Sequence, residues 1–232
     1  MAASSMIVND YHDRAIDEVN EPERPIPSGL VTPREALAFA SATSLVGFAA
    51  AYFTSLSTLA LAVIAWAALA VYTTVGKRSG LPGNFLVSTC VAIPFVYGSL
   101  AVTDAVGTNV LLLASMAFLS NTGREITKGI IDVEGDQLHD VKTLAVRYGT
   151  RNAAIAAVVF YMLAVSLSPL PWFLRLVSHW FIVLVAIADL GLVASSVALL
   201  RGYSREKARM VKKSVLLWFM IGLSAFLAGS LS

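Results

Sequence analysis

The sequence predicts an all-α protein, a polytopic bundle of transmembrane helices with seven spans. Hydrophobic residues make up 57% of the 232-residue chain and charged residues only 14%, and the mean hydropathy is +0.73. A soluble domain carries about 25% charged residues. This composition therefore excludes a disordered chain, a nucleic-acid-binding protein and an ordinary soluble enzyme. The single cysteine, Cys90, excludes an intrachain disulfide.

Each predicted span is a stretch almost free of charge, and crossing a bilayer takes about 20 such residues. Residues 36–76 contain no Asp, Glu, Lys or Arg and provide two spans, divided at the polar run 54–58. The other five predicted spans are 79–103, 105–123, 152–174, 176–200 and 214–232. Helices are required because hydrocarbon offers backbone groups no hydrogen-bond partner. Asp189 interrupts one span, and we expect it to be buried and hydrogen-bonded.

The basic residues predict which side of the membrane each loop faces. With seven spans, all but one of the 17 Lys and Arg residues fall on the same side, and only Arg175 lies opposite. Such an asymmetry marks the cytoplasmic side. We therefore predict a multi-pass protein of the cell membrane whose functional loops face the cytoplasm.

Two acidic segments on that side, residues 9–17 and 132–140, carry the predicted chemistry. In each segment a carboxylate or amide recurs every four residues, which places these side chains on one face of a helix. The candidate metal ligands are Asn9, Asp10, Asp13, Asp17, Asp132, Asp136 and Asp140. Oxygen ligands of this kind suit Mg²⁺ held together with substrate phosphates. We predict that the two segments face each other and hold two Mg²⁺ ions around a diphosphate.

Basic side chains near these segments are predicted to neutralise the remaining phosphate charge. Lys77, Arg124 and Lys128 lie beside the acidic segments in the predicted topology, and such residues form charge-assisted hydrogen bonds with phosphate. The alternative interpretation is that both acidic segments are merely solvated loops. The same four-residue spacing in two loops on one side of the membrane argues against that alternative.

The acidic segments resemble the two aspartate-rich motifs of the UbiA-type intramembrane prenyltransferase family. NDYHDRAIDEVNEPERPIPSG is similar to the first motif, NDxxDxxxD, and DVEGDQLHD to the second, DxxxD. The flanking GREITKGIIDVEGD and the RPIPSG tail resemble archaeal members that act in ether-lipid synthesis. The resemblance implies Mg²⁺-dependent transfer of a geranylgeranyl group from its diphosphate to geranylgeranylglyceryl phosphate. Its partners would then be a prenyl diphosphate, a glycerol-phosphate lipid acceptor and membrane lipid, and no nucleic acid.

The resemblance also implies roles for individual residues. Asp13, Asp136 and Lys77 would take part in catalysis. The family's Tyr-xxx-Lys element is matched imperfectly, since Tyr72 and Lys77 are five residues apart instead of four. The predicted substrate-binding residues are Arg14, Tyr72, Lys77, Arg124 and Lys128.

Residues 1–232 are expected to form a single transmembrane prenyltransferase domain. The family has about nine helices, and its first motif follows the second of them. Only eight residues precede Asn9 in this chain, too few to cross a bilayer at 1.5 Å per residue. We therefore expect most of the first two helices to lie upstream of Met1.

Two other functions remain open from the sequence. The first is prenyl transfer to another acceptor, such as a quinone precursor, haem or a chlorin, and dependence on a glycerol phosphate would discriminate it. The second is a non-catalytic protein that binds or carries isoprenoid diphosphates. Such a carrier would keep the metal site but would release labelled diphosphate unreacted.

Overall fold

The computed structural model describes residues 2–138 and 141–230, and over these ranges the regular elements are all helical. Eight of the helices are long. They are α1 (Ala2–Asn20), α2 (Pro33–Thr54), α3 (Leu56–Thr74), α4 (Leu81–Thr103), α5 (Thr108–Ile131), α7 (Leu144–Leu167), α9 (His179–Leu200) and α10 (Arg205–Ser230). The short elements are η1 (Gly76–Arg78), α6 (Val133–Leu138) and α8 (Leu170–Phe173). The predicted all-α class is confirmed.

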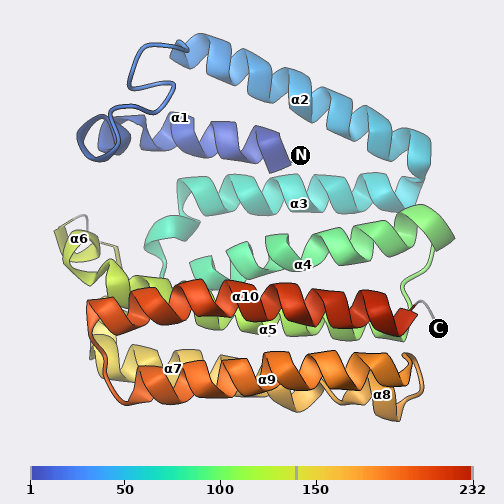
Figure 1. Ribbon diagram of the computed structural model, residues 1–232. Coiled ribbons are helices and arrows are strands. Elements are labelled where there is room, and N and C mark those ends of the chain that lie inside the picture. The colour runs from blue at the N-terminus through green and yellow to red at the C-terminus, as the bar shows by residue number, and fades with distance from the viewer. Residues whose placement is uncertain (1, 139–140, 231–232) are drawn as a thin grey trace.

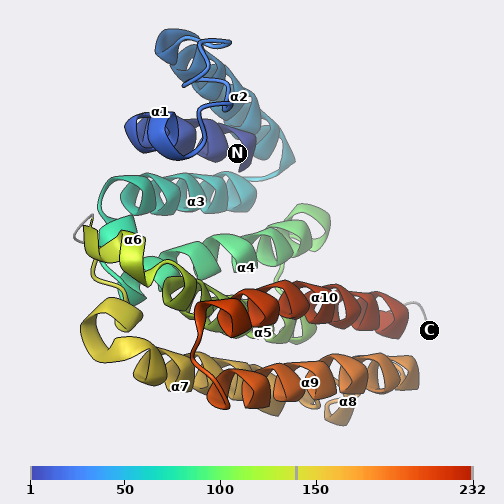
Figure 2. The same cartoon turned by 60° about the vertical axis from the view of Figure 1, so that its left-hand side comes forward.

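The long helices lie side by side, and most of them are arranged in chain order. Figures 1 and 2 show α1 and α2 at one edge, then α3 and α4, then α5 with α10, and finally α7 with α9 at the other edge. Helix α5 packs against α4, α7 and α10 and therefore occupies the middle of the bundle. The turn after α3 and helix α6 lie at the same end of the bundle as the loop after α1, on the left of Figure 1.

The boundary between α2 and α3 illustrates how local chemistry sets the helix ends. Ser55 has an extended backbone (φ −167°, ψ 164°), and its side chain accepts a hydrogen bond from the Thr58 backbone N–H. The Thr58 hydroxyl in turn contacts the Ser55 backbone N–H, so the pair forms a capping box. Thr58 also donates to the Ala51 carbonyl oxygen of α2 at 2.8 Å. The break predicted at residues 54–58 is therefore confirmed.

By length and hydropathy, one helix fewer qualifies as a span than predicted. Six helices of the described chain are long and apolar enough to cross a membrane, with α7 and α8 counted as one stretch. The helix missing from that set is α5, which we predicted as a span over residues 105–123. It runs eight residues further, to Ile131, and this added half carries Arg124, Glu125 and Lys128. These charges lower its hydropathy, and most of the neighbouring side chains face protein instead of lipid.

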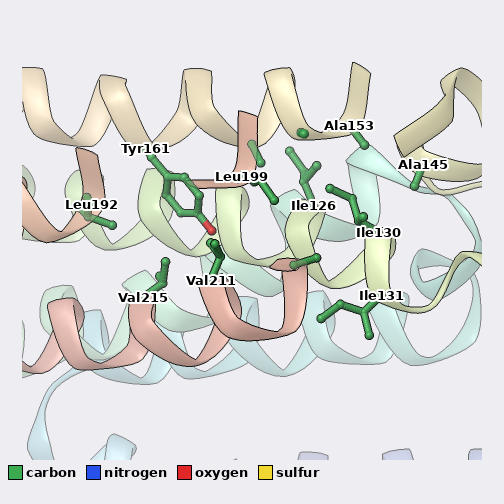
Figure 3. Packing of buried hydrophobic residues seen from close by; sticks show 13 residues of the cluster. Ile126, Ile130, Ile131, Ala145, Ala153, Tyr161, Leu192, Leu199, Val211 and Val215 are labelled. Atoms are coloured by element: carbon green, nitrogen blue, oxygen red, sulfur yellow. The ribbon is translucent and has the colours of Figure 1, made fainter. Parts of the chain in front are cut away.

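The main apolar core fixes α5 against α7, α9 and α10, as Figure 3 shows. Small residues permit this close packing, as in other membrane bundles: a Cβ added to Gly123 would lie 2.7 Å from the Tyr161 ring. The Tyr161 hydroxyl is buried and lies 3.0 Å from the Thr127 hydroxyl. The core consists of Ile126, Ile130, Ile131, Ala145, Ala153, Ala154, Ala157, Tyr161, Leu192, Leu199, Ala208, Val211 and Val215.

Candidate active site

The first acidic segment lies on α1, as expected, but its side chains divide into two sets. Asn9 Nδ2 donates to Asp13 Oδ2 at 2.9 Å, so these two residues, one turn apart, act as a pair. Asp10 and Asp17, two turns apart, instead accept from one guanidinium nitrogen. Arg24 Nη1 lies 3.2 Å from Asp10 Oδ1 and 2.9 Å from Asp17 Oδ2. Asp13 and Asp17, predicted on one face, therefore have different partners.

Arg24 is a residue that the sequence analysis did not assign to the site. It lies in the loop between α1 and α2, and its Nε also donates to Glu21. The hydrogen bond to Glu21, together with the nearby charges of Asp17 and Asp10, raises the pKa of the Arg24 guanidinium. In the sequence, Arg24 stands out only as the first residue of the RPIPSG tail, and that tail does not indicate which carboxylates Arg24 would contact. It fixes the loop over the acidic face of α1.

The second acidic segment begins where α5 ends. The Asp132 backbone N–H closes the last turn of α5 on the Lys128 carbonyl oxygen at 3.1 Å. The short helix α6 follows, and the Asp136 N–H donates to the Asp132 carbonyl oxygen at 2.8 Å. Asp132 and Asp136 therefore lie one helical turn apart, like Asn9 and Asp13. Asp140, the third predicted ligand of this segment, lies outside the described residues.

The donors of each segment are compatible with a magnesium ion that also binds phosphate. Over the described residues, no three His, Cys, Asp or Glu side chains lie close enough together to hold a metal ion by themselves. Mg²⁺ is usually held by one or two carboxylates together with substrate phosphates and water. Asn9 with Asp13, and Asp132 with Asp136, each offer two oxygen donors. The donor chemistry therefore fits two ions whose remaining ligands come from a diphosphate.

Tyr72, near the end of α3, lies within reach of charges on α1 and α5. Tyr72 lies close enough to Glu125 of α5 and Asp13 of α1 for both carboxylates to act electrostatically on its hydroxyl. Charged groups of α1 and α5 therefore act on a polar group of α3. The predicted member Lys77 lies in η1, and its side chain is outside what the structure describes.

Arg124 and Glu125 form an ion pair in the C-terminal half of α5. Arg124 Nη1 lies 2.9 Å from Glu125 Oε1, and the side chains are only 21% and 11% exposed. Arg124 Nε is also buried, and no group of the described chain accepts its hydrogen bond. Leaving a buried donor unpaired costs about 1–3 kcal/mol, more for a charged group. An anionic ligand oxygen would satisfy this nitrogen.

The other predicted basic residues are placed differently. Lys128 is exposed and lies one turn before Asp132 on α5. Arg14 donates to the Tyr11 carbonyl oxygen at 2.7 Å, and its guanidinium carbon lies 4.5 Å from the centre of the Tyr11 ring. Arg14 is thus held against its own helix, and none of its contacts in the described chain reaches the second acidic segment.

Backbone contacts tie the segment after α3 to the segment after α6. The Lys142 N–H donates to the Arg78 carbonyl oxygen at 3.2 Å. Gly80, which precedes α4, has a positive φ of 74°, and an added Cβ would lie 2.3 Å from the Lys142 carbonyl oxygen. Only glycine allows this approach. The element with Tyr72 is thereby held beside the element with Asp136.

An apolar cavity of about 180 Å³ begins one turn from Arg124, toward the other membrane face. Ser120, Met116 and Leu113 of α5 line it together with residues of α4, α7, α9 and α10. Asp189 lies in its wall and accepts a hydrogen bond from the Ser168 hydroxyl at 2.5 Å, as expected for an acid within a span. The polar site and the apolar cavity are therefore adjacent along α5.

Comparisons with known proteins agree with this arrangement. Residues 1–226 match the UbiA prenyltransferase family. The digeranylgeranylglyceryl phosphate synthase of Archaeoglobus fulgidus is 39% identical over 99% of this chain and 80% of its own length. The synthase of Korarchaeum cryptofilum is 36% identical over 95% of this chain and 78% of its own length.

Two solved structures share the fold. One, from work on digeranylgeranylglyceryl phosphate synthase in membranes, has a TM-score of 0.85 and 32% identity, and the match covers 98% of this chain and 80% of that chain. The apo UbiA homolog from Aeropyrum pernix K1 has a TM-score of 0.81 at 21% identity, covering 97% and 84%, and supports the fold alone. With paired acidic segments at one end of a helical bundle, and with relatives that match along nearly its whole length, this chain belongs to the UbiA prenyltransferase family.

Proposed function

We propose that this protein transfers a geranylgeranyl group from geranylgeranyl diphosphate to geranylgeranylglyceryl phosphate, in archaeal ether-lipid synthesis. The observation that carries the proposal is the second acidic segment at the end of α5 beside an apolar cavity along the same helix, with the α1 segment near the same end of the bundle. A diphosphate with a long prenyl chain needs both environments side by side. The digeranylgeranylglyceryl phosphate synthases named above support the choice of acceptor.

The proposed metal ligands are Asn9 and Asp13 for one Mg²⁺ ion and Asp132 and Asp136 for the other. Bound Mg²⁺ stabilises the negative charge that develops on the departing diphosphate. Asp17 is proposed to act indirectly, by holding Arg24 and its loop, and Asp10 shares that role. Asp140 remains a candidate ligand of the second ion.

The phosphates are proposed to contact the basic side chains of the site. Arg124 Nε is the best supported contact, because this buried donor lacks an acceptor in the described chain. Lys128 lies one turn from Asp132 and would neutralise the outer phosphate. Tyr72 of α3 is proposed to contact the leaving group, and Lys77 remains a proposed contact of the same group. Arg14 is also proposed to contact the acceptor phosphate. To do so, its guanidinium must give up its contacts with the Tyr11 carbonyl oxygen and ring.

The apolar cavity is proposed to hold a prenyl chain and to keep water from the reacting carbon. An allylic cation that meets water gives the free alcohol, so exclusion of water favours transfer. The ion pair of Arg124 and Glu125 marks the polar limit of this cavity. We further propose that the domain spans residues 1–232 and that the acidic segments face the cytoplasm of the cell membrane.

The proposed function is tested by purified protein in liposomes with labelled geranylgeranyl diphosphate and geranylgeranylglyceryl phosphate. We expect an ether product of the combined mass, loss of that product with EDTA, and its return with Mg²⁺. A quinone precursor, haem and a chlorin are supplied in parallel. Preferential prenylation of one of these would contradict the proposed acceptor, and diphosphate that is bound but never consumed would indicate a carrier.

Two substitutions test the assignment of the metal ligands. Asp13→Asn and Asp136→Asn each remove an anionic ligand while nearly preserving shape, so each should lower product formation by at least about 100-fold without loss of folded protein. Asp104→Asn is the matched control, since Asp104 lies at the other end of the bundle in a left-handed conformation that asparagine also adopts. Near-normal turnover by both site variants would refute the assignment.

A further inference from the structure

The first turns of α10 carry cations along one face of the helix. Four basic residues at positions i, i+4, i+7 and i+8 share this face, and we call them the basic stripe: Arg205, Arg209, Lys212 and Lys213. The residues that anchor α10 in the apolar core lie on another side of the helix, at Ala208, Val211 and Val215. The basic stripe is therefore separate from the face by which α10 packs on the bundle.

The basic stripe begins beside the second acidic segment. Arg205 Nη1 lies 3.8 Å from Glu134 Oε2, and Glu134 belongs to the short helix α6 that follows Asp132. Ile131, the last residue of α5, packs in the same core as the start of α10. Within the described chain, no carboxylate forms an ion pair with the other three cations of the stripe. Three positive charges next to the acidic segment therefore lack a partner from the protein there.

Further along α10 the same face becomes apolar and reaches the cavity. Phe219, Met220 and Leu223 of this face line the cavity. Leu216 precedes them on the same face, and it is exposed, as are Met220 and Leu223. The described helices thus leave the face uncovered between the basic stripe and the cavity. One side of a single helix therefore presents cations first and an apolar surface after them.

A phosphorylated isoprenoid lipid matches this face in charge and in length. Phosphate oxygens form charge-assisted hydrogen bonds with Arg and Lys. Lys212 and Leu223 lie 11 residues apart, about 16 Å along the helix. A chain of four isoprene units extends by about 20 Å, because its C–C bonds measure about 1.5 Å. A dry cavity of about 150 Å³ holds benzene, so the cavity of about 180 Å³ has room for the distal part of such a chain.

An apolar helix laid over the same face would be less favourable. It would remove the cations of the basic stripe from water without giving them a partner, and unpaired buried charges are costly. The phosphate of a lipid provides the opposite charge at the level of the stripe, and its chain covers the apolar surface below.

We infer that this face of α10 binds the acceptor, geranylgeranylglyceryl phosphate, an inference that rests on the proposed function. The phosphate contacts Arg209 and Lys212 of the basic stripe. The isoprenoid chain runs along the exposed apolar surface, and its distal part enters the cavity beside Leu223. The two anionic headgroups then use separate cations, Mg²⁺ for the donor diphosphate and the basic stripe for the acceptor phosphate. Arg14, the other proposed contact of the acceptor phosphate, lies on α1, and Figures 1 and 2 show α3 and α4 between α1 and α10.

The test measures binding of labelled geranylgeranylglyceryl phosphate to the full chain in phosphatidylcholine nanodiscs, without donor. Arg209→Gln and Lys212→Gln should each raise the Kd about tenfold, the effect of losing one hydrogen bond to a charged group. Lys207→Gln is the matched control, since it removes the same charge from the opposite side of α10, where the Lys207 side chain lies over Gly202. It should change the Kd by less than about twofold, because an exposed charge at that distance is screened.

A second pair of variants tests the apolar half of the face. Leu223→Trp fills the cavity and should weaken binding of the acceptor. Leu227→Trp, one turn further along α10 and outside the cavity lining, is its control and should bind the acceptor like the unchanged protein. Geranylgeranylglycerol, which lacks the phosphate, should bind equally to the unchanged protein and to Arg209→Gln.

Competitors distinguish the acceptor from other sources of phosphate. Inorganic phosphate and phosphatidylglycerol are added at the concentration of the acceptor, and neither should displace it. Displacement by phosphatidylglycerol would overturn the inference and indicate a general site for anionic lipids. Displacement by inorganic phosphate would overturn it as well, because the chain would then contribute nothing to binding.

Kinetics in liposomes complete the test. The KM for the acceptor should rise in Arg209→Gln by the same factor as the Kd, and the KM for geranylgeranyl diphosphate should stay unchanged. Equal losses in Arg209→Gln and Lys207→Gln would overturn the inference, since they would indicate that the basic residues only orient the bundle. A larger loss in Arg14→Gln than in Arg209→Gln would also overturn it and place the phosphate at α1. Unchanged protein that binds the acceptor through the basic stripe but forms no ether would refute the proposed function alone.

Discussion

Replacement of Gly80 by alanine should damage both stability and activity, because the chain leaves no space for a Cβ there. The backbone of Gly80 has φ 74° and ψ −119°, a region that other residues rarely adopt. The added Cβ would lie 2.3 Å from the Lys142 carbonyl oxygen, whereas ordinary contact begins at 3.4 Å. That oxygen belongs to the backbone and cannot rotate away, so the segment after α6 would have to move by about 1 Å.

The expected loss of stability follows from two contributions. The strained backbone contributes about 1–3 kcal/mol, and overpacking contributes about 1–3 kcal/mol more. At about 2–4 °C per kcal/mol for a chain of this size, the unfolding midpoint in detergent should fall by roughly 5–20 °C. Activity should fall by up to about 100-fold even below that midpoint, since a displacement of about 1 Å disturbs the approach of reacting groups.

Gly98→Ala is the matched control for this prediction. Gly98 lies within α4, the helix that Gly80 precedes, and an added Cβ there meets nothing within 4 Å. Alanine inside a helix is more favourable than glycine by roughly 0.5–1 kcal/mol, so this variant should be as stable as the unchanged protein or slightly more so. The midpoint is measured as the fraction of protein that stays monodisperse after heating. Equal midpoints and equal ether formation for the two variants would refute the proposed role of Gly80.

Two further predictions concern the loop after α1 and the orientation of the bundle. Arg24→Gln should expose the loop to a glutamate-specific protease and lower ether formation, because Asp10 and Asp17 lose their shared cation. Arg14→Gln is the control and should leave cleavage of the loop unchanged. Equal cleavage of the two variants would contradict this reasoning. In a background without the native cysteine, a cysteine at Gly135 should react only with reagents on the cytoplasmic side and one at Thr108 only from the opposite side. Reaction of both from the same face would refute the topology.

Features that depend on nearby residues were predictable from the sequence. Composition and the length of charge-free stretches predicted the all-α transmembrane class, because lipid leaves the backbone no alternative to helices. The break at residues 54–58 followed from hydroxyl side chains that cap helix ends. The four-residue spacing places Asn9 and Asp13, and Asp132 and Asp136, one helical turn apart.

Features that depend on contacts between distant segments were decided by the tertiary structure. The spacing rule could not separate Asp17 from Asp13, because that separation depends on Arg24 reaching back over α1 from a loop. Nor could it show that the second half of α5 is buried among neighbouring helices. The burial of Glu125 depends on the same neighbours. Sequence periodicity records which face of a helix is polar, but the packing of helices determines which of those polar groups meet.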